Sequence, residues 1–128
     1  VLSHNTLGSV ELAELAPALY RNTSIKVLHL SGNDLNDKES ARLLRDILRS
    51  NQTITTLDLS CNRFGKTTGA LECIADGLGR NATLLKIDLS GCALGDVGIT
   101  IFGASARQSE HNPAEPHSRY EFNYIYGL

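Results

Sequence analysis

The residues best suited to chemistry are two carboxylates at matching positions of two similar segments. Asp58 and Asp88 lie thirty residues apart, each followed by Leu-Ser, and His29 holds the same position in an earlier segment. Two neighbouring carboxylates can perform acid–base catalysis when burial moves their pKa values apart. If these side chains lie on an open, solvated surface, burial cannot shift their pKa values far. The pair is therefore expected to bind a partner and not to catalyse a reaction. Simple solvation of these side chains is the alternative.

Other catalytic or metal-binding patterns are absent from the sequence. It contains no G-x-S-x-G, phosphate-binding loop or H-E-x-x-H motif. The histidines do not fall at ligand spacing with cysteines or carboxylates; they are His4, His29, His111 and His117. We therefore expect no enzyme activity, no cofactor and no bound metal.

The three cysteines are Cys61, Cys73 and Cys92, without C-x-x-C spacing. An odd number with this spacing favours reduced thiols in a cytosolic core over a disulfide or metal framework.

Composition restricts the protein class. The chain has 128 residues, 41% hydrophobic and 20% charged, with a formal net charge of −2 and a pI of about 6.1. This apolar content is enough for a folded core, no run approaches the length of a membrane span, and the charge lacks the basic excess of a nucleic-acid binder. The chain has no Met and starts at Val1 within a repeat motif, so we expect further repeats or another domain before it.

The elements that must position these residues come from an internal repeat. The segments IKVLHLSGNDL from Ile25, ITTLDLSCNRF from Ile54 and LLKIDLSGCAL from Leu84 share their apolar positions, and a partial copy starts at Leu2. The equivalent leucines are spaced by 28, 29 and 30 residues: Leu2, Leu30, Leu59 and Leu89. Between the segments, apolar residues recur at helical spacing. The pattern therefore predicts that each repeat contains a short strand, a turn, a helix of about three turns and a return loop.

This pattern resembles the leucine-rich repeat family, in its longer, helix-containing ribonuclease-inhibitor-like subclass. The resemblance covers roughly residues 1–108 and implies an α/β solenoid of about four repeats, the first truncated. It implies a horseshoe with parallel strands on the concave face and helices on the convex face.

Strand alternation predicts which side chains line the concave face. Leu28, Leu57 and Ile87 point into the core, and the residues on either side point outward. The predicted partner-binding residues are Val27, His29, Ser31, Thr56, Asp58, Ser60, Lys86, Asp88 and Ser90. Because two carboxylates are central to this set, a protein partner with a basic patch is expected.

A second candidate surface lies on the expected helix at residues 38–50. Arg42, Arg45 and Arg49 share an outer stripe there, which could dock a partner or simply be solvated. Glu72 holds the position of Arg42 in the next helix and is expected to neutralise part of the stripe.

Asparagines recur at two positions of the repeat. Asn33 and Asn62 follow the strands, where a buried amide can satisfy backbone groups, and Cys92 replaces the third. Asn22, Asn51 and Asn81 start N-x-S/T patterns at the helix ends. We interpret them as helix caps in the left-handed conformation, within a cytoplasmic protein; glycosylation of a secreted protein is the alternative.

The C-terminal part departs from the repeat. The fourth helix is expected from Asp96 to Arg107, and residues 109–119 form a polar loop with two prolines. Tyr120, Phe122, Tyr124 and Tyr126 alternate with other residues, which predicts a capping strand over residues 120–128 at the sheet edge. A peptide docked on a neighbour is the alternative.

These observations favour a non-catalytic protein-interaction or scaffold module, part of a larger intracellular leucine-rich-repeat protein. The resemblance leaves three other functions open: the repeat domain of a small-GTPase activator, of a ubiquitin-ligase substrate receptor, or of an innate-immune sensor of the nucleotide-binding receptor type.

Overall fold

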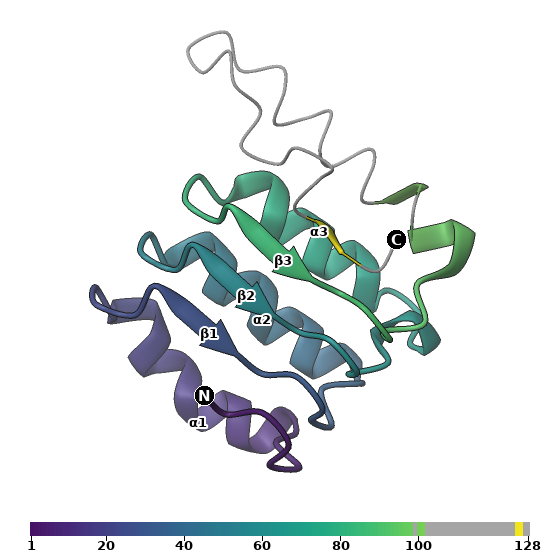
Figure 1. Cartoon of the computed structure of the whole chain (residues 1–128), viewed down its shortest axis with the longest axis horizontal. Helices are drawn as coiled ribbons and strands as arrows, with labels where there is room; N and C mark the ends of the chain where they lie inside the picture. The colour runs from purple at the N-terminus through teal and green to yellow at the C-terminus, as the bar shows by residue number, and fades with distance from the viewer. Residues whose placement is uncertain (99, 102–124, 127–128) are drawn as a thin grey trace, which may run out of the picture.

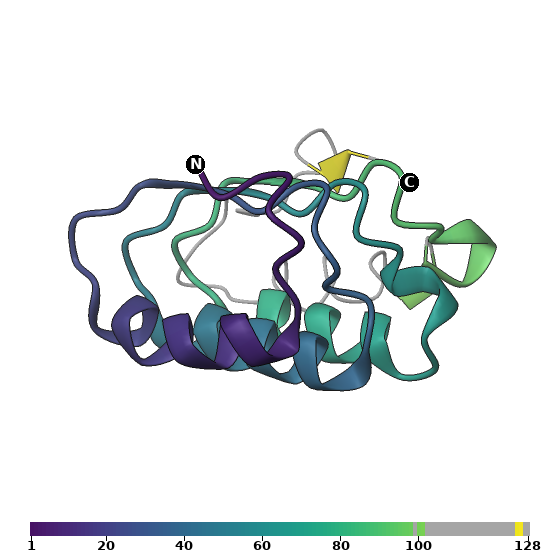
Figure 2. The same cartoon turned by 90° about the horizontal axis from the view of Figure 1, so that it is seen from below.

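Strands and helices form two separate layers in a computed structural model, which describes residues 1–98, 100–101 and 125–126. The strands are β1 (Val27–His29), β2 (Thr56–Asp58), β3 (Lys86–Asp88) and β4 (Ile125–Tyr126). The helices are α1 (Ser9–Arg21), α2 (Lys38–Ser50) and α3 (Ala70–Arg80), with a short 3₁₀ helix, η1 (Phe64–Lys66). Figure 1 shows the strands side by side, and Figure 2 shows the helices together beneath them.

The sheet is parallel, in the order β1-β2-β3-β4. Leu28 pairs with Leu57, and Leu57 pairs with Ile87, so the core positions expected from the repeat lie in one row. All three side chains are buried. The predicted strand–turn–helix coil and its phase are therefore confirmed for the repeats that begin at β1 and β2, and the strand of the third repeat lies in the same row.

The first coil also joins the sheet, although no strand is assigned there. The backbone N–H groups of Leu2 and His4 donate to the carbonyls of His29 and Ser31, each at 2.9 Å. Helix α1 then starts at Ser9 and continues through Pro17 to Arg21. Pro17 therefore does not divide the first repeat.

Glycine is required where two turns approach each other. A Cβ atom on Gly65 would lie 1.7 Å from the carbonyl oxygen of Ala93, far shorter than any allowed contact.

The turn after each strand has a residue with positive φ. Gly32 and Gly91 have φ near 64° and 68°, and Cys61 occupies the equivalent turn position with φ of 60°. The turn thus needs a left-handed residue, which Cys61 adopts at a steric cost.

The Asn residues at the helix ends do act as C-caps, but their predicted left-handed conformation is wrong. Asn22, Asn51 and Asn81 have φ of −67°, −79° and −82°, all in the extended region. Their side chains cap the following loop instead. Asn51 Oδ1 accepts from the N–H groups of Thr53 and Ile54, and its Nδ2 donates to the Leu19 carbonyl at 2.8 Å.

The asparagines after the strands bridge the coils at the opposite corner. Asn62 Nδ2 donates to the carbonyls of Leu30 and Leu59, each at 2.9 Å, and its Oδ1 accepts from Leu35 N–H. Cys92 replaces this amide with a thiol that reaches Leu59 O at 3.2 Å. The last turn is therefore held by fewer bonds than its equivalents.

The C-terminal predictions fall mostly outside the described residues. Residues 95–98 and 100–101 are helical, but 102–107 of the expected fourth helix and all of the loop at 109–119 lie outside. Of the strand expected at 120–128, only β4 is described; Ile125 pairs with Ile87 and Tyr126 with Asp88. The proposed boundaries at 108 and 119 thus remain predictions.

Candidate functional site

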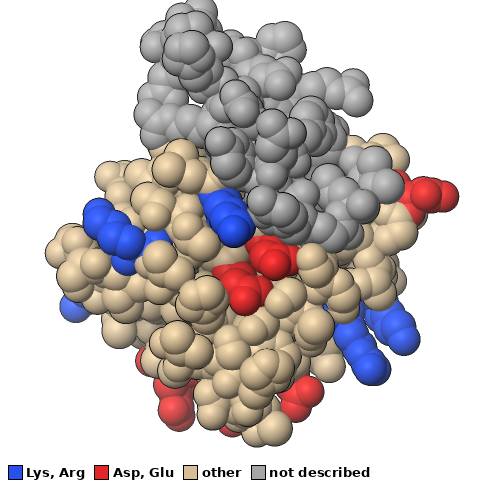
Figure 3. Space-filling model, in the orientation of Figure 1, with Lys and Arg blue, Asp and Glu red and all other residues tan. Residues whose placement is uncertain are grey.

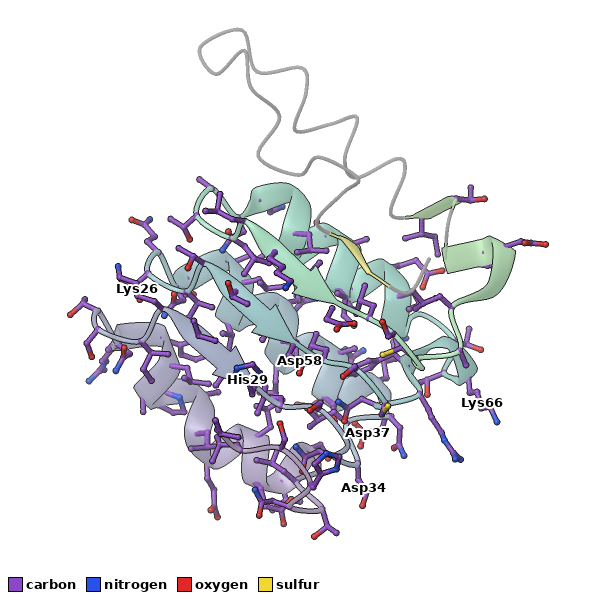
Figure 4. All side chains as sticks on the ribbon, in the orientation of Figure 1. Lys26, His29, Asp34, Asp37, Asp58 and Lys66 are labelled. Atoms are coloured by element: carbon purple, nitrogen blue, oxygen red, sulfur yellow. The ribbon has the colours of Figure 1, made fainter. Side chains whose placement is uncertain are left out.

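The face of the sheet away from the helices presents the strand residues that the sequence singled out. Two rows run across the strands: Val27 pairs with Thr56 and Thr56 with Lys86, while His29 pairs with Asp58 and Asp58 with Asp88. Val27 and Lys86 are exposed and the other four are partly buried. We call these six side chains the open strand face; Figure 4 shows His29 and Asp58 adjacent on it.

Negative charge concentrates at the centre of the open strand face. Asp58 and Asp88 are paired across neighbouring strands, whose spacing in a sheet is about 4.8 Å. Figure 3 shows acidic side chains gathered there, with a basic side chain beside them. Lys86 lies two residues before Asp88 and faces the same side as it.

The Asp58 carboxylate is held in a fixed orientation. Its Oδ1 accepts from the backbone N–H and hydroxyl of Ser60, at 3.0 and 2.7 Å, and its Oδ2 lies 3.4 Å from His29 Nδ1. Partial burial alone would raise the pKa of Asp58, but the Ser60 and His29 interactions outweigh it and lower the pKa. The group is therefore a charged acceptor at neutral pH, not a general acid.

Ser60 and Ser90, which follow β2 and β3, hydrogen-bond to the aspartates of the open strand face and orient their carboxylates. Ser90 N–H donates to Asp88 Oδ1 at 2.9 Å, which repeats the backbone bond of the Ser60–Asp58 arrangement. Ser31 differs, because its hydroxyl donates to Ser3 Oγ at 2.8 Å. The site residues predicted from the sequence are thus brought together, with the serines as supporting residues.

The three arginines of α2 are each paired with a carboxylate. Arg42 lies 3.8 Å from Glu39, Arg45 lies 2.9 Å from Asp46, and Arg49 lies 2.5 Å from Asp76 of α3. None of the ion pairs among the described residues involves Glu72; the carboxylate of α3 that pairs with the arginines of α2 is Asp76. Residues at the same position of two neighbouring helices point the same way, whereas Asp76 faces α2.

The cysteines of the described coils are free thiols. Cys61 is exposed, Cys73 is partly buried and Cys92 is buried. Burial raises the pKa of the Cys92 thiol, which keeps it protonated and unreactive. The described part of the chain holds no group of three His, Cys, Asp or Glu side chains suited to a metal ion.

Two of the three N-x-S/T patterns have their glycosylation atom engaged. Glycans attach to Asn Nδ2, and this atom donates to Leu19 O in Asn51 and to Leu48 O in Asn81. Both residues are buried. A glycan at either position would be incompatible with the folded coil.

Sequence reasoning did not single out a hollow of about 500 Å³ beside α3. It lies between residues 65–72, from η1 to the start of α3, and the residues that follow β3, with Lys66, Leu71, Leu94 and Ile101 among its lining residues. The feature of the sequence that could have indicated this hollow is the spacing of 30 residues from Leu59 to Leu89. It is the longest of the three repeat spacings, and Gly65 and Gly69 lie in its first part.

No helix that the structure describes is long and apolar enough to cross a membrane.

Comparison with known proteins adds sequence relatives. A family model described as a leucine rich repeat matches residues 21–38, 50–67 and 80–100. The chain is 38% identical over 95 residues to "NACHT, LRR and PYD domains-containing protein 12" of Mus musculus, covering 74% of this chain and 9% of that protein. It is 31% identical over 97 residues to "NACHT, LRR and PYD domains-containing protein 13" of Homo sapiens, covering 75% of this chain. The chain spans 9% of the length of each relative.

Proposed function

Because the chain is a leucine-rich repeat protein, we propose that it is a non-catalytic module that binds a protein partner through the open strand face. The observation that carries the proposal is the Asp58–Asp88 pair at the centre of that face. Asp58 is held by the backbone N–H and hydroxyl of Ser60 and Asp88 by the backbone N–H of Ser90, so both carboxylates are preorganised acceptors for a cationic side chain. Such charge-assisted hydrogen bonds are stronger than neutral ones.

The partner surface that fits this face is basic. A Lys or Arg side chain that reaches the paired carboxylates would meet Asp58 beside His29 on one side and Asp88 on the other. The exposed side chain of Val27 adds an apolar contact at the edge of the same face. Electrostatic complementarity of this kind favours specificity and rapid association.

We also propose that the array curves into a horseshoe with the strands on the concave side. Neighbouring strands are spaced by about 4.8 Å and packed helices by about 8–10 Å. Stacking coils with a wide helix layer and a narrow strand layer bends the array toward the strands. Small-angle scattering of the chain should then fit a curved particle better than a straight one.

The second candidate function is the repeat domain of an innate-immune sensor of the nucleotide-binding receptor type. The relatives' names join LRR to NACHT and PYD domains, which favours this assignment over a GTPase activator or ubiquitin-ligase receptor. Such a protein would be cytoplasmic. The engaged amides of Asn51 and Asn81 and the free thiols support that location.

The test of partner binding compares two faces of the same chain. Proteins captured by the immobilised wild-type chain are compared with those captured by an Asp58→Asn, Asp88→Asn variant, which keeps side-chain size and the acceptor for Ser60. An Arg42→Gln, Arg45→Gln variant is the control for the helix face. The proposal expects salt-sensitive binding that is lost only in the first variant.

Binding that is lost only in the Arg42→Gln, Arg45→Gln variant would instead indicate that the partner binds the helix face. Its three arginines remain the alternative docking residues, although each already contacts a carboxylate. Equal binding by all three proteins would reject both faces.

A further inference from the structure

The last residues of β1, β2 and β3 form one row on the open strand face, and the first of them is a histidine. His29, Asp58 and Asp88 are in register across the three strands, and Figure 4 shows His29 beside Asp58. Histidine is the side chain whose charge ordinarily changes between about pH 5 and 8. Protonation of His29 therefore places a cation in a row that otherwise carries carboxylates.

His29 contacts the oxygen of Asp58 that Ser60 leaves open. Asp58 Oδ1 accepts from the backbone N–H and the hydroxyl of Ser60, whereas Oδ2 lies 3.4 Å from His29 Nδ1. This separation is longer than an ordinary N–H···O bond of about 2.9 Å, so a neutral ring holds Oδ2 only weakly. A protonated ring donates from both nitrogens, and its charge-assisted bond to a carboxylate is shorter and stronger.

The same oxygen is the one that a partner's cation would use. Asp58 Oδ1 already accepts two hydrogen bonds, which fill its lone pairs. The His29 side chain is 40% exposed and the Asp58 side chain 22% exposed, so solvent and a partner have access to both. A partner's Lys or Arg at Asp58 therefore competes with a protonated His29 for Oδ2 and is repelled by its charge.

Few other charged groups face His29. On one side of β1, the first coil donates its Leu2 N–H to the His29 carbonyl at 2.9 Å. The titratable groups of that coil are the Val1 amino group and His4. The helices lie beneath the opposite face of the sheet (Figure 2). Among the described residues, Asp58 is the carboxylate that pairs with His29, so a charge on His29 acts first on Asp58.

The strands on the other side supply Asp58 from β2, with Lys86 and Asp88 from β3 beyond it. Burial would raise the pKa of Asp58, but the hydrogen bonds from Ser60 and the contact with His29 lower it below its ordinary value. Asp58 is therefore ionised throughout the interval in which histidine ordinarily titrates. A change of binding in that interval cannot come from neutralising Asp58.

We propose that His29 makes partner binding by the open strand face sensitive to pH, because its protonated ring competes with the partner's cationic side chain for Asp58. This role rests on the proposed function, since it acts on the same carboxylates. Binding is weaker at about pH 5.5 than at about pH 7.5, because histidine ordinarily gains its proton over this interval. The expected change in affinity is about two- to fivefold, which is what an ion pair between accessible side chains contributes.

The test measures the binding of a rhodamine-labelled peptide of repeated Arg-Gly units to the full chain by fluorescence anisotropy. Arginine keeps its charge at every pH used, so only the protein titrates. The readout is the ratio of the dissociation constants at pH 5.5 and pH 7.5, at constant ionic strength. We expect a ratio of about two to five for the wild-type chain and of about one for His29→Gln, whatever affinity that variant has. His29→Lys, which is cationic at both pH values, should also give a ratio of about one.

His4→Gln is the matched control. The His4 ring packs against Gly32 in the turn after β1, where a Cβ would lie 2.3 Å from His4 Nδ1, and it does not belong to the row. This variant should keep the wild-type ratio. A second measurement needs no peptide: the pH titration of the His29 ring carbons by NMR should move to a lower midpoint in Asp58→Asn, because the protonated ring loses its carboxylate.

The outcomes separate the role of His29 from the proposed function. A pH dependence that His29→Gln retains, or an NMR midpoint that Asp58→Asn leaves unchanged, would overturn the role of His29 and leave the open strand face as the binding surface. Peptide binding that the Asp58→Asn, Asp88→Asn variant does not weaken at pH 7.5, or no binding at all, would reject the proposed function and the role of His29 together.

Discussion

Asn51 and Leu19 are joined by a hydrogen bond from the side-chain amide to the backbone carbonyl, at 2.8 Å, although 32 residues separate them. The same amide group accepts from Thr53 and Ile54 through Oδ1. One buried side chain therefore closes its own loop and fastens it to the coil before. The N-x-T pattern around it reflects this structural role.

Replacing Asn51 by Ala should cost about 1–3 kcal/mol of unfolding free energy, because it leaves a buried carbonyl and two N–H groups without partners. Asn22→Ala is the matched control, since Asn22 lacks the bond to an earlier coil and is less buried. Urea unfolding measures both. Equal losses in the two variants would show that the bond between coils adds nothing.

Leu57→Ala should destabilise the chain by about 2–5 kcal/mol through a cavity in the middle of the core row. Val27→Ala is its control: it starts the neighbouring strand but is 49% exposed, so its effect should stay within about 0.5 kcal/mol. A near-neutral Leu57→Ala would contradict the strand phase on which the open strand face depends.

Asp58 should contribute to acid sensitivity. Its pKa in the folded chain is below the ordinary value of 3.8, so its ionised form stabilises the fold above pH 3.8, and this stabilisation is lost as the pH falls through the lowered pKa. Asp58→Asn should flatten the decline of stability in acid. Ser60→Ala should raise the pKa of Asp58, measured by NMR titration of the carboxyl carbon; an unchanged pKa would refute the role of the hydroxyl.

Cys92→Asn should stabilise the chain by about 0.5–1.5 kcal/mol, because it restores the amide that the equivalent coils use. The reciprocal Asn62→Cys should destabilise it, because it removes the bonds to Leu30, Leu59 and Leu35. Thermal and chemical unfolding of both variants check the pair. A destabilised Cys92→Asn would mean that the last turn is adapted to the smaller thiol.

The Arg49–Asp76 pair links α2 to α3 at the surface and should contribute only about 0.2–1 kcal/mol in a double-mutant cycle. The coupling energy should fall as salt is added. A larger, salt-insensitive coupling would indicate that the helix face depends on this contact for its structure.

The sequence was sufficient to predict the features that recur at the same position of every repeat. Leu28, Leu57 and Ile87 could be placed in one row from the nearly constant repeat length and strand alternation, and Asp58 and Asp88 followed as neighbours. These inferences depend only on period and on local geometry, both of which are visible in a single chain.

Features set by contacts between coils were not predictable in the same way. Left-handed caps were expected at Asn22, Asn51 and Asn81 from the preferences of isolated helix ends, whereas all three are extended and accept a backbone N–H of the following loop through Oδ1. Glu72 was matched to Arg42 by position, but the sides of neighbouring helices that face each other carry different positions, and Arg49 pairs with Asp76.

The asparagine bonds that cross from each coil to the one before it have a consequence for breakage. A deletion or cleavage inside the middle coil would leave the asparagine amides of the following coil without acceptors and the carbonyls of the preceding coil without donors. Both neighbouring coils should therefore be destabilised. Loss of a terminal coil orphans groups on a single flank only. Such an array should therefore tolerate trimming from its ends far better than a break in its interior.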